Sequence, residues 1–399
     1  MPGIQPKYKI IQANLHYLVI LVLALASVPA LYAVHLTTAV HWQRLISLYW
    51  IGFGLRSVAA ACILALIGLP LKVTVRPVWN HFAAHKLRLF IFVPFVFWLF
   101  WKFDVYISLV WISVALVSSE LLDRSYEDPE TIRRSIGRVI FPTTYFFLGL
   151  ILVSAYNDVA VAAGRTIQYD WLFLKIDSYL LHGTSISRLA RTTTQNLSPH
   201  VFAAVEAIYY HMFDQVGAAI ILISICYGTR QGARLVGTLL TAYFLSILIF
   251  CLWPSFGPFY TCPDHFAHFP KWLITYGAQR NILGNAELLL SSHRGLSRIG
   301  TDYFIAFPSM HIADPLIVLW FLRRWKRAVY CLIAYDIVMI PAILLLEWHY
   351  VVDLIGGAAV AIIAIWINNI PEAAKTPEQR DIQLSSETAE EPSILVSTP

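Results

Sequence analysis

The segment Glu347-Trp348-His349-Tyr350-Val351-Val352-Asp353 opens an apolar run that extends to about residue 369. His349 and Asp353 are four positions apart, so on a helix they share a face and the carboxylate can hold one imidazole nitrogen. A second histidine, His311, follows Phe307-Pro308-Ser309-Met310 at the start of another apolar run. Displacement at phosphorus needs a nucleophile and an acid for the leaving oxygen. The pair therefore predicts a phosphoryl-transfer site, with His349 as nucleophile, His311 as acid and Asp353 fixing the tautomer of His349.

The two histidines also have a simpler interpretation. A histidine beside Trp348 and Tyr350 at a helix end can sit at a membrane interface, where amphipathic rings collect. Ionisable groups at the edge of a hydrophobic span are costly and usually functional, so two histidines with an aspartate favour a catalytic site.

Composition places the chain in a membrane. The 399 residues are 58% hydrophobic and only 13% charged, with a mean hydropathy of +0.63, which excludes an ordinary soluble protein. The net charge of +5 is modest and lies in loops beside the spans, so no nucleic-acid partner is expected. Candidate membrane spans lie near residues 15–34, 46–68, 139–156, 201–226, 235–253, 309–322, 328–346 and 350–369.

The apolar stretch 89–119 allows two interpretations, one long tilted helix or a hairpin of two. Lys102 and Asp104 interrupt it. Lys and Arg favour cytoplasmic loops, and the hairpin places all the basic connections on one side, giving ten spans with both termini in the cytoplasm. Both histidines then face the opposite side. We expect a multi-pass protein of a bacterial inner membrane whose site faces the periplasm or exterior, or a Golgi-type lumen in a eukaryote.

The expected fold is all-α, a polytopic transmembrane helical bundle in three regions. Residues 1–138 hold about four transmembrane helices of unknown role, residues 139–370 a six-span catalytic core, and residues 371–399 a disordered cytoplasmic tail. Within the core, residues 164–200 mix bulky apolar and charged side chains, which predicts a helix lying on the bilayer surface.

These motifs resemble a known family. Pro308-Ser309-Met310-His311 and His349-Tyr350-x-x-Asp353, followed by Gly356-Gly357, are similar to the last two signatures of the type 2 phosphatidic acid phosphatase superfamily. The resemblance implies a six-helix phosphatase-type core. Two positions depart from the pattern: Leu69 stands where the first signature has Lys, and Ala342-Ile343 stand where Ser-Arg is usual.

Both departures occur in the branch that contains inositol phosphorylceramide synthase. Gly295-Leu296-Ser297-Arg298-Ile299 and Phe256-Gly257-Pro258-Phe259-Tyr260 resemble two further elements of that synthase. Gly300 stands where the synthase has Asp. The resemblance covers about residues 139–370 and implies transfer of an inositol phosphate-like head group to a lipid alcohol such as ceramide.

Phosphoryl oxygens need cationic or N–H donors, for which Arg298 is the first candidate and Arg294 the second, although a solvated loop charge also explains Arg294. The motifs add Ser309, Tyr260 and Tyr350 as candidate substrate-binding residues. The chain has neither a Gly-rich phosphate loop nor a zinc pattern, so we expect no cofactor and no metal.

Three functions remain open. The first is a phosphotransferase whose partners are a membrane phospholipid donor and a lipid alcohol acceptor. The alternative is a lipid phosphate phosphatase acting on isoprenoid or glycerolipid phosphates. The third is a non-catalytic membrane protein, which the joint presence of His311, His349 and Asp353 disfavours. The product distinguishes the first two functions: a phosphotransferase forms a lipid with a transferred head group, and a phosphatase releases free phosphate.

Overall fold

The computed structural model describes a large part of the predicted core. The described residues are 57, 60, 61, 137–150, 152–153, 168–263, 269–291 and 305–373. Every regular element among them is helical. The predicted N-terminal helices, the hairpin at 89–119 and the tail beyond residue 373 lie outside these residues, so the ten-span topology and the domain boundaries stay predictions.

Nine labelled helices follow one another in the described residues after 168, and residues 137–150 are helical as well. The labelled helices are α9 (Asp170–Leu180), α10 (Ile186–Thr194), α11 (Pro199–Tyr210), α12 (Met212–Leu252), α13 (Pro258–Thr261), α15 (Ile274–Ser291), α16 (Met310–Leu322), α17 (Lys326–Leu345) and α18 (Val351–Ala373).

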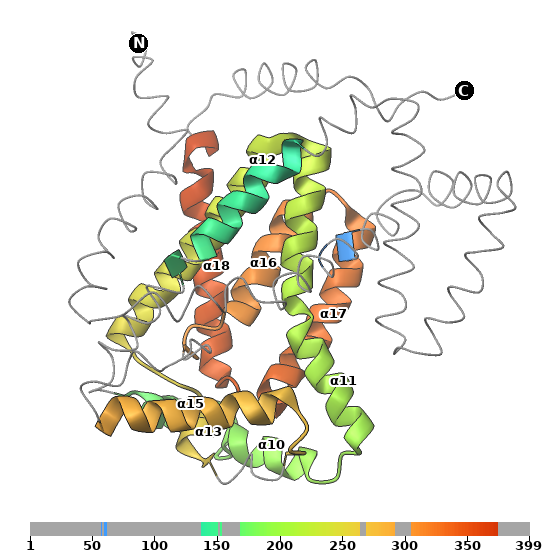
Figure 1. Cartoon of the computed structure of the whole chain (residues 1–399). Helices are drawn as coiled ribbons and strands as arrows, with labels where there is room; N and C mark the ends of the chain where they lie inside the picture. Colours follow the sequence, from blue (N-terminus) through green and yellow to red (C-terminus); the bar gives the residue numbers. More distant parts are fainter. Residues whose placement is uncertain are drawn as a thin grey trace, which may run out of the picture.

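The long helix α12 is two helices joined at Gly228. The backbone there has φ 83° and ψ 166°, a conformation that only glycine adopts readily. The two arms diverge from this turn (Figure 1) and are in contact beside it, where Gly232 on one arm lies against the side chain of Ser224 on the other. The span predicted at 201–226 corresponds to α11 and the first arm together, and the span predicted at 235–253 corresponds to the second arm.

Three described helical stretches are long and apolar enough to cross a membrane, namely Pro199–Leu252, Lys326–Leu345 and Val351–Asn369. Helix α16 is a shorter apolar helix that packs against α12, α17 and α18 and buries Ala313, Ile317 and Val318. The outer faces of α17 and α18 expose large aliphatic side chains, as lipid-facing helices do. The chain is therefore an integral membrane protein, and the part of it that the structure describes is all-helical.

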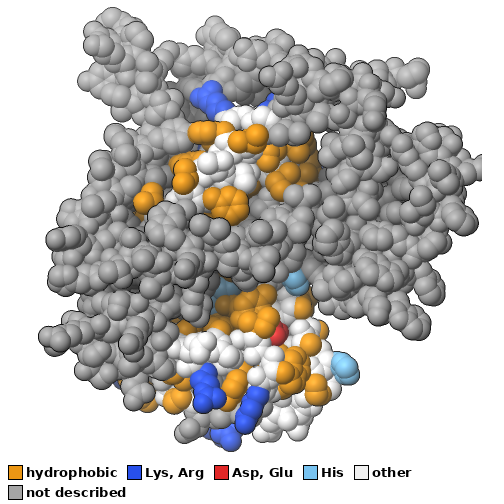
Figure 2. Space-filling view, viewed as in Figure 1, with side chains coloured by type: hydrophobic (Ala, Val, Ile, Leu, Met, Phe, Trp, Pro, Cys, Tyr) orange, Lys and Arg blue, Asp and Glu red, His pale blue; other side chains and the backbone are white. Residues whose placement is uncertain are grey.

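Helices α10, α13 and α15 lie across one end of the bundle (Figure 1). Helix α9 packs against α13 and α18 at the same end. Figure 2 shows basic side chains at both ends of the described surface, with hydrophobic ones between them. Hydrogen bonds connect the loops at the end where α9 lies: Tyr169 N–H donates to the Pro254 carbonyl (2.8 Å), and Ala306 N–H to the Ser255 carbonyl (3.0 Å).

The predicted surface helix within 164–200 is present as α9 and α10, but α9 is oriented differently from the expectation for its charged residues. Asp170 and Asp177 are 1% and 0% exposed, whereas Trp171 and Tyr179 are 68% and 85% exposed. The carboxylates point into the protein because backbone N–H groups there bind them, and the aromatic rings point outward.

Close packing of α16 against α18 requires glycine at position 357. A Cβ atom there would overlap the carbonyl oxygen of Ser309. We predict that Gly357→Ala lowers stability by at least the ~1–3 kcal/mol typical of overpacking and reduces activity, because the backbones must move apart. Thermal unfolding of the detergent-solubilised protein measures this.

The matched control is Gly277→Ala in α15, where a Cβ would meet nothing within 4 Å. That substitution should be neutral or stabilise by up to ~1 kcal/mol, since alanine is the better helix former. Equal unfolding temperatures for the two variants would contradict the packing explanation.

Candidate active site

His349 lies in the turn between α17 and α18. Helix α17 ends before Glu347, whose φ is +57°, and α18 begins at Val351. The Oδ2 atom of Asp353, in the first turn of α18, accepts the Tyr350 N–H (2.8 Å) and lies 3.3 Å from His349 Nδ1. The contact expected from helical spacing is thus present, but it is made by a turn that precedes the helix.

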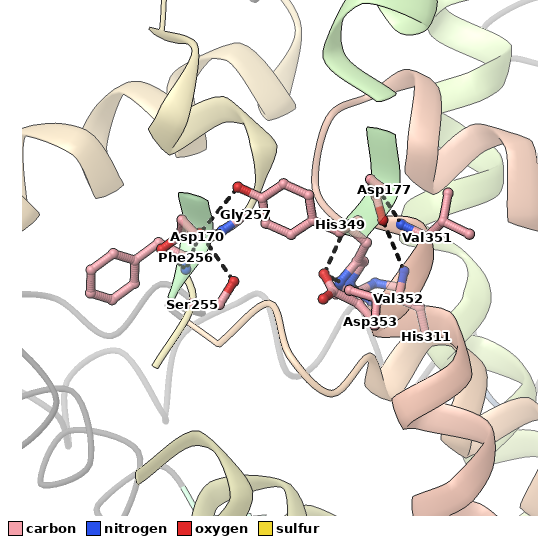
Figure 3. A network of polar contacts seen from close by, with 11 residues as sticks. Asp170, Asp177, Ser255, Phe256, Gly257, His311, His349, Val351, Val352 and Asp353 are labelled. Atoms are coloured by element: carbon pink, nitrogen blue, oxygen red, sulfur yellow. Dashed lines mark hydrogen bonds and ion pairs between the residues drawn. The ribbon is translucent and has the colours of Figure 1, made fainter. Parts of the chain in front are cut away.

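His311 in the first turn of α16 faces His349 (Figure 3). Its Nδ1 lies 3.3 Å from His349 Nε2, and the ring planes are inclined by 62°. The N–H of Ser309 donates to the backbone carbonyl of Asp353 (3.1 Å), which joins the two histidine-bearing segments directly. Two histidines 38 residues apart are therefore brought together at the N-terminal ends of two packed helices.

Aromatic rings enclose His311. The Tyr209 ring stacks on its imidazole with centroids 4.4 Å apart, and the Trp348 ring stacks on Tyr209 at 5.5 Å with an interplanar angle of 4°. Phe213 meets the imidazole edge-on at 5.5 Å. These contacts fix the plane of the His311 ring.

Several polar atoms around the histidines have no hydrogen-bond partner among the described residues, although they are buried. Native proteins pair nearly all such atoms, so unpaired ones mark a place where a ligand or water binds. They are Ser309 Oγ, His311 Nε2, Trp348 Nε1 and Asp353 Oδ1.

Two of the predicted substrate-binding residues, Ser309 and Tyr350, lie beside the histidines, and the position of Tyr260 is given by α13. Ser309 precedes α16 and is fully buried, and Tyr260 lies half-buried in α13. The hydroxyl of Tyr350 contacts Thr261 Oγ1 (3.2 Å) and Asp170 Oδ1 (3.3 Å), which favours a supporting role for Tyr350. Arg294 and Arg298 lie outside the described residues.

Two aspartates of α9 belong to this network and were not recognised from the sequence (Figure 3). Asp170 binds the loop 255–257, and Asp177 binds the N-terminus of α18. Burial raises the pKa of Asp170 to about 7 and that of Asp177 to about 6. Their seven-residue spacing, which puts them on one helix face, was the available signal.

Glu347 is a buried carboxyl group two residues before His349. It is 0% exposed, and neither of its oxygens has a hydrogen-bond partner among the described residues. Burial raises its pKa from 4.5 to about 8, and the nearby Ser187 hydroxyl and Arg191 charge offset this only in part. The side chain is therefore neutral in the folded protein at pH 7.

Comparison with known proteins agrees with this arrangement. The chain is an integral membrane protein, and residues 181–367 match the family described as the PAP2 superfamily. These residues form a domain of that superfamily, so the protein is a phosphatase or phosphotransferase that acts on phosphate esters. No curated protein and no solved structure gives a match.

The described residues offer no group of three His, Cys, Asp or Glu side chains that could hold a metal ion.

Glu347 predicts a pH dependence of stability. Its pKa is about 8 in the folded protein and 4.5 as the unperturbed value, so between these pH values the folded state binds one more proton and stability falls as pH rises. We expect Glu347→Gln to remove this contribution to the fall in the free energy of unfolding. At ~1.4 kcal/mol per pKa unit, the contribution is on the order of 2–4 kcal/mol between pH 5 and pH 8.

Unfolding temperatures of wild type and Glu347→Gln, measured in the same detergent from pH 5 to 8, provide the comparison. The variant should show the flatter curve and the higher value at pH 8. Parallel curves would mean that Glu347 is not buried as a neutral acid.

Proposed function

We propose that the enzyme transfers a polar phosphoryl head group, inositol phosphate-like, from a membrane phospholipid to a lipid alcohol such as ceramide. The observation that supports transfer is the burial of the pair: His349 is 4% exposed and His311 9% exposed, with Asp353 fully buried behind them. A site closed to water disfavours hydrolysis of a reactive intermediate, so a lipid hydroxyl that enters from the membrane competes well as acceptor.

The first step uses His349 as nucleophile. A proton on Nδ1, held toward Asp353, leaves the lone pair on Nε2 free to attack phosphorus. The bond from phosphorus to the diacylglycerol oxygen breaks, and His311, which takes up a proton from water when the anionic phosphodiester binds beside it, gives that proton to the leaving oxygen. The products are diacylglycerol and a phosphohistidine that carries the head group.

The second step regenerates the enzyme. His311, now neutral, takes the proton of an acceptor hydroxyl, whose oxygen attacks phosphorus and breaks the N–P bond. Because His349 Nε2 and His311 Nδ1 are only 3.3 Å apart, the rings must separate to admit the phosphoryl group.

Negative charge on the phosphoryl oxygens needs partners. The N-terminus of α16 carries His311 and therefore presents its positive dipole end beside the site. The unpaired Ser309 hydroxyl is a further donor. We propose Arg298, and secondarily Arg294, as the cations that bind the head-group phosphate.

We propose that residues 139–370 are the catalytic core and residues 1–138 an additional helical region. We further propose that the site faces away from the cytoplasm, because the basic loop with exposed Arg323, Arg324 and Arg327 joins α16 to α17 at the ends opposite the histidines.

Product analysis tests this function. Purified protein is placed in vesicles that contain phosphatidylinositol, phosphatidylglycerol and phosphatidic acid as donors, with ceramide and diacylglycerol as acceptors. Mass spectrometry should detect a new head-grouped lipid, formed by wild type and reduced at least ~10³-fold in His349→Ala, since the nucleophile is lost.

Two other outcomes decide against transfer. Free phosphate that depends on His349, without any new head-grouped lipid, identifies a lipid phosphate phosphatase. No His349-dependent product across these lipids would contradict the catalytic assignment of the histidine pair for both functions.

A further inference from the structure

Helix α9 has two faces whose chemistry is the reverse of an ordinary surface helix. Asp170, Phe173 and Asp177 are buried on one side, within two turns of each other. Trp171 and Tyr179 are exposed on the other. Charged groups are expensive to bury, so their position requires specific partners.

Asp177 binds the helix that carries the histidine's aspartate. Its Oδ2 accepts the Val351 N–H (2.8 Å) and its Oδ1 accepts the Val352 N–H (3.2 Å) (Figure 3). These are two of the N–H groups that lack partners within an α-helix, and a carboxylate there also interacts favourably with the helix dipole. Asp177 therefore fixes the position at which α18 begins, directly after His349 and Tyr350.

Asp170, the other buried aspartate of α9, binds the loop 255–257. Its Oδ1 accepts the Gly257 N–H (2.8 Å), the Phe256 N–H (2.9 Å) and the Ser255 hydroxyl (3.0 Å). That loop in turn contacts the segment of His349. Phe259 N–H donates to the Glu347 carbonyl (3.3 Å), and a Cβ at Gly257 would come within 2.6 Å of the Trp348 carbonyl oxygen.

Phe173 reaches the segment that precedes the other histidine. Its ring lies 4.8 Å from that of Phe307 and 6.1 Å from that of Tyr350, centroid to centroid. Phe307 belongs to the Phe307-Pro308-Ser309-Met310-His311 segment. A single face of α9 thus contacts both histidine-bearing segments and the loop 255–257.

We propose that α9 sets the geometry of the histidine pair, with Asp177 and Asp170 as positioning residues that do not themselves touch the reacting phosphorus. The inference rests on the proposed function, because it assigns a role in orienting His349 as nucleophile. It also extends the site beyond the matched family region, which begins at residue 181, immediately after α9.

The physical effect is on rate. The aligned contact between His349 Nε2 and His311 depends on where the turn 346–350 is held, and Asp177 is bonded to the two residues that follow this turn. A displacement of about 1 Å at the reacting atoms can cost on the order of 10²-fold in rate. Loss of either carboxylate should therefore reduce kcat without removing a substrate contact.

The experiment compares Asp177→Asn with wild type in the full-length protein, in vesicles of phosphatidylinositol, phosphatidic acid and ceramide, from pH 5 to 8. Asparagine has the shape of a protonated aspartate, and its amide nitrogen cannot accept a backbone N–H bond. Burial raises the pKa of Asp177 to about 6, and the ionisable group that acts on it from α18 is Asp353. Below pH 6 the wild-type residue is itself neutral and resembles the variant.

The expected result is a ratio of wild-type to variant kcat that changes with pH. It should approach about 10²-fold above pH 7 and shrink to a few-fold near pH 5, with KM for the donor lipid changed by less than about twofold. Stability itself depends on pH, so kcat is calculated per folded enzyme, with the folded fraction of wild type and variant measured at each pH. A ratio that does not change with pH would overturn the proposal, as would a ratio near one throughout.

Two further variants complete the test. Tyr179→Phe, on the exposed face of the same helix, is the matched control and should match wild type at every pH. Asp170→Asn should show the same pH-dependent ratio with a midpoint nearer pH 7, because burial raises the pKa of Asp170 to about 7, and it replaces Asp177→Asn where that variant does not fold.

His349→Ala in the same preparations separates the two hypotheses. If His349→Ala abolishes product and the Asp177 and Asp170 variants behave as wild type, α9 has no positioning role but the proposed function stands. If His349→Ala retains activity, the proposed function fails.

Discussion

Asp353 is the residue that connects the segment of His349 to the segment of His311. Its side chain accepts the Tyr350 N–H and faces His349 Nδ1, and its backbone carbonyl accepts the Ser309 N–H from the segment of His311. One residue thereby orients a histidine and joins two helix N-termini. Because Asp353 is fully buried, these contacts are made where water cannot compete, and each of them matters more than it would at the surface.

That burial explains the architecture around the site. Ionisable groups are kept at the end of an apolar bundle, so the structure must supply them with partners. Backbone N–H groups from the loop 255–257 and from α18 bind Asp170 and Asp177, while Glu347 is neutral because burial raises its pKa to about 8. Close packing of α16 on α18 at Gly357 holds the two histidine-bearing segments together.

Much of this could be predicted from residue patterns. Apolar runs located the spans now seen as the arms of α12, as α17 and as α18, and the spacing of His349 and Asp353 predicted their contact. His311 and His349 were predicted to act as a pair because each stands at the start of an apolar run, and motif similarity supported this. A spacing of 38 residues does not itself predict a contact, which only the packing of α16 against α18 produces.

The α9 contacts could not be predicted in the same way. Asp170 and Asp177 interleave with exposed aromatic residues, so composition alone suggests solvated charges on a surface helix. Their partners include backbone N–H groups 86 and 174 residues away, and backbone groups leave no mark in a side-chain pattern. The +57° φ of Glu347, which ends α17 and allows His349 to lie in a turn, is likewise a feature that its residue type does not announce.

The central claim, that His349 is the nucleophile, is tested most directly by trapping the covalent intermediate. Full-length enzyme is mixed in vesicles with a donor phospholipid labelled at phosphorus, in the absence of an acceptor alcohol, and quenched within one turnover. Label that is stable to alkali, labile to acid and located on the peptide containing His349 is the expected result, and it should be absent from His349→Ala. Label on another residue, or turnover without any labelled protein, would contradict the assignment of His349 as nucleophile.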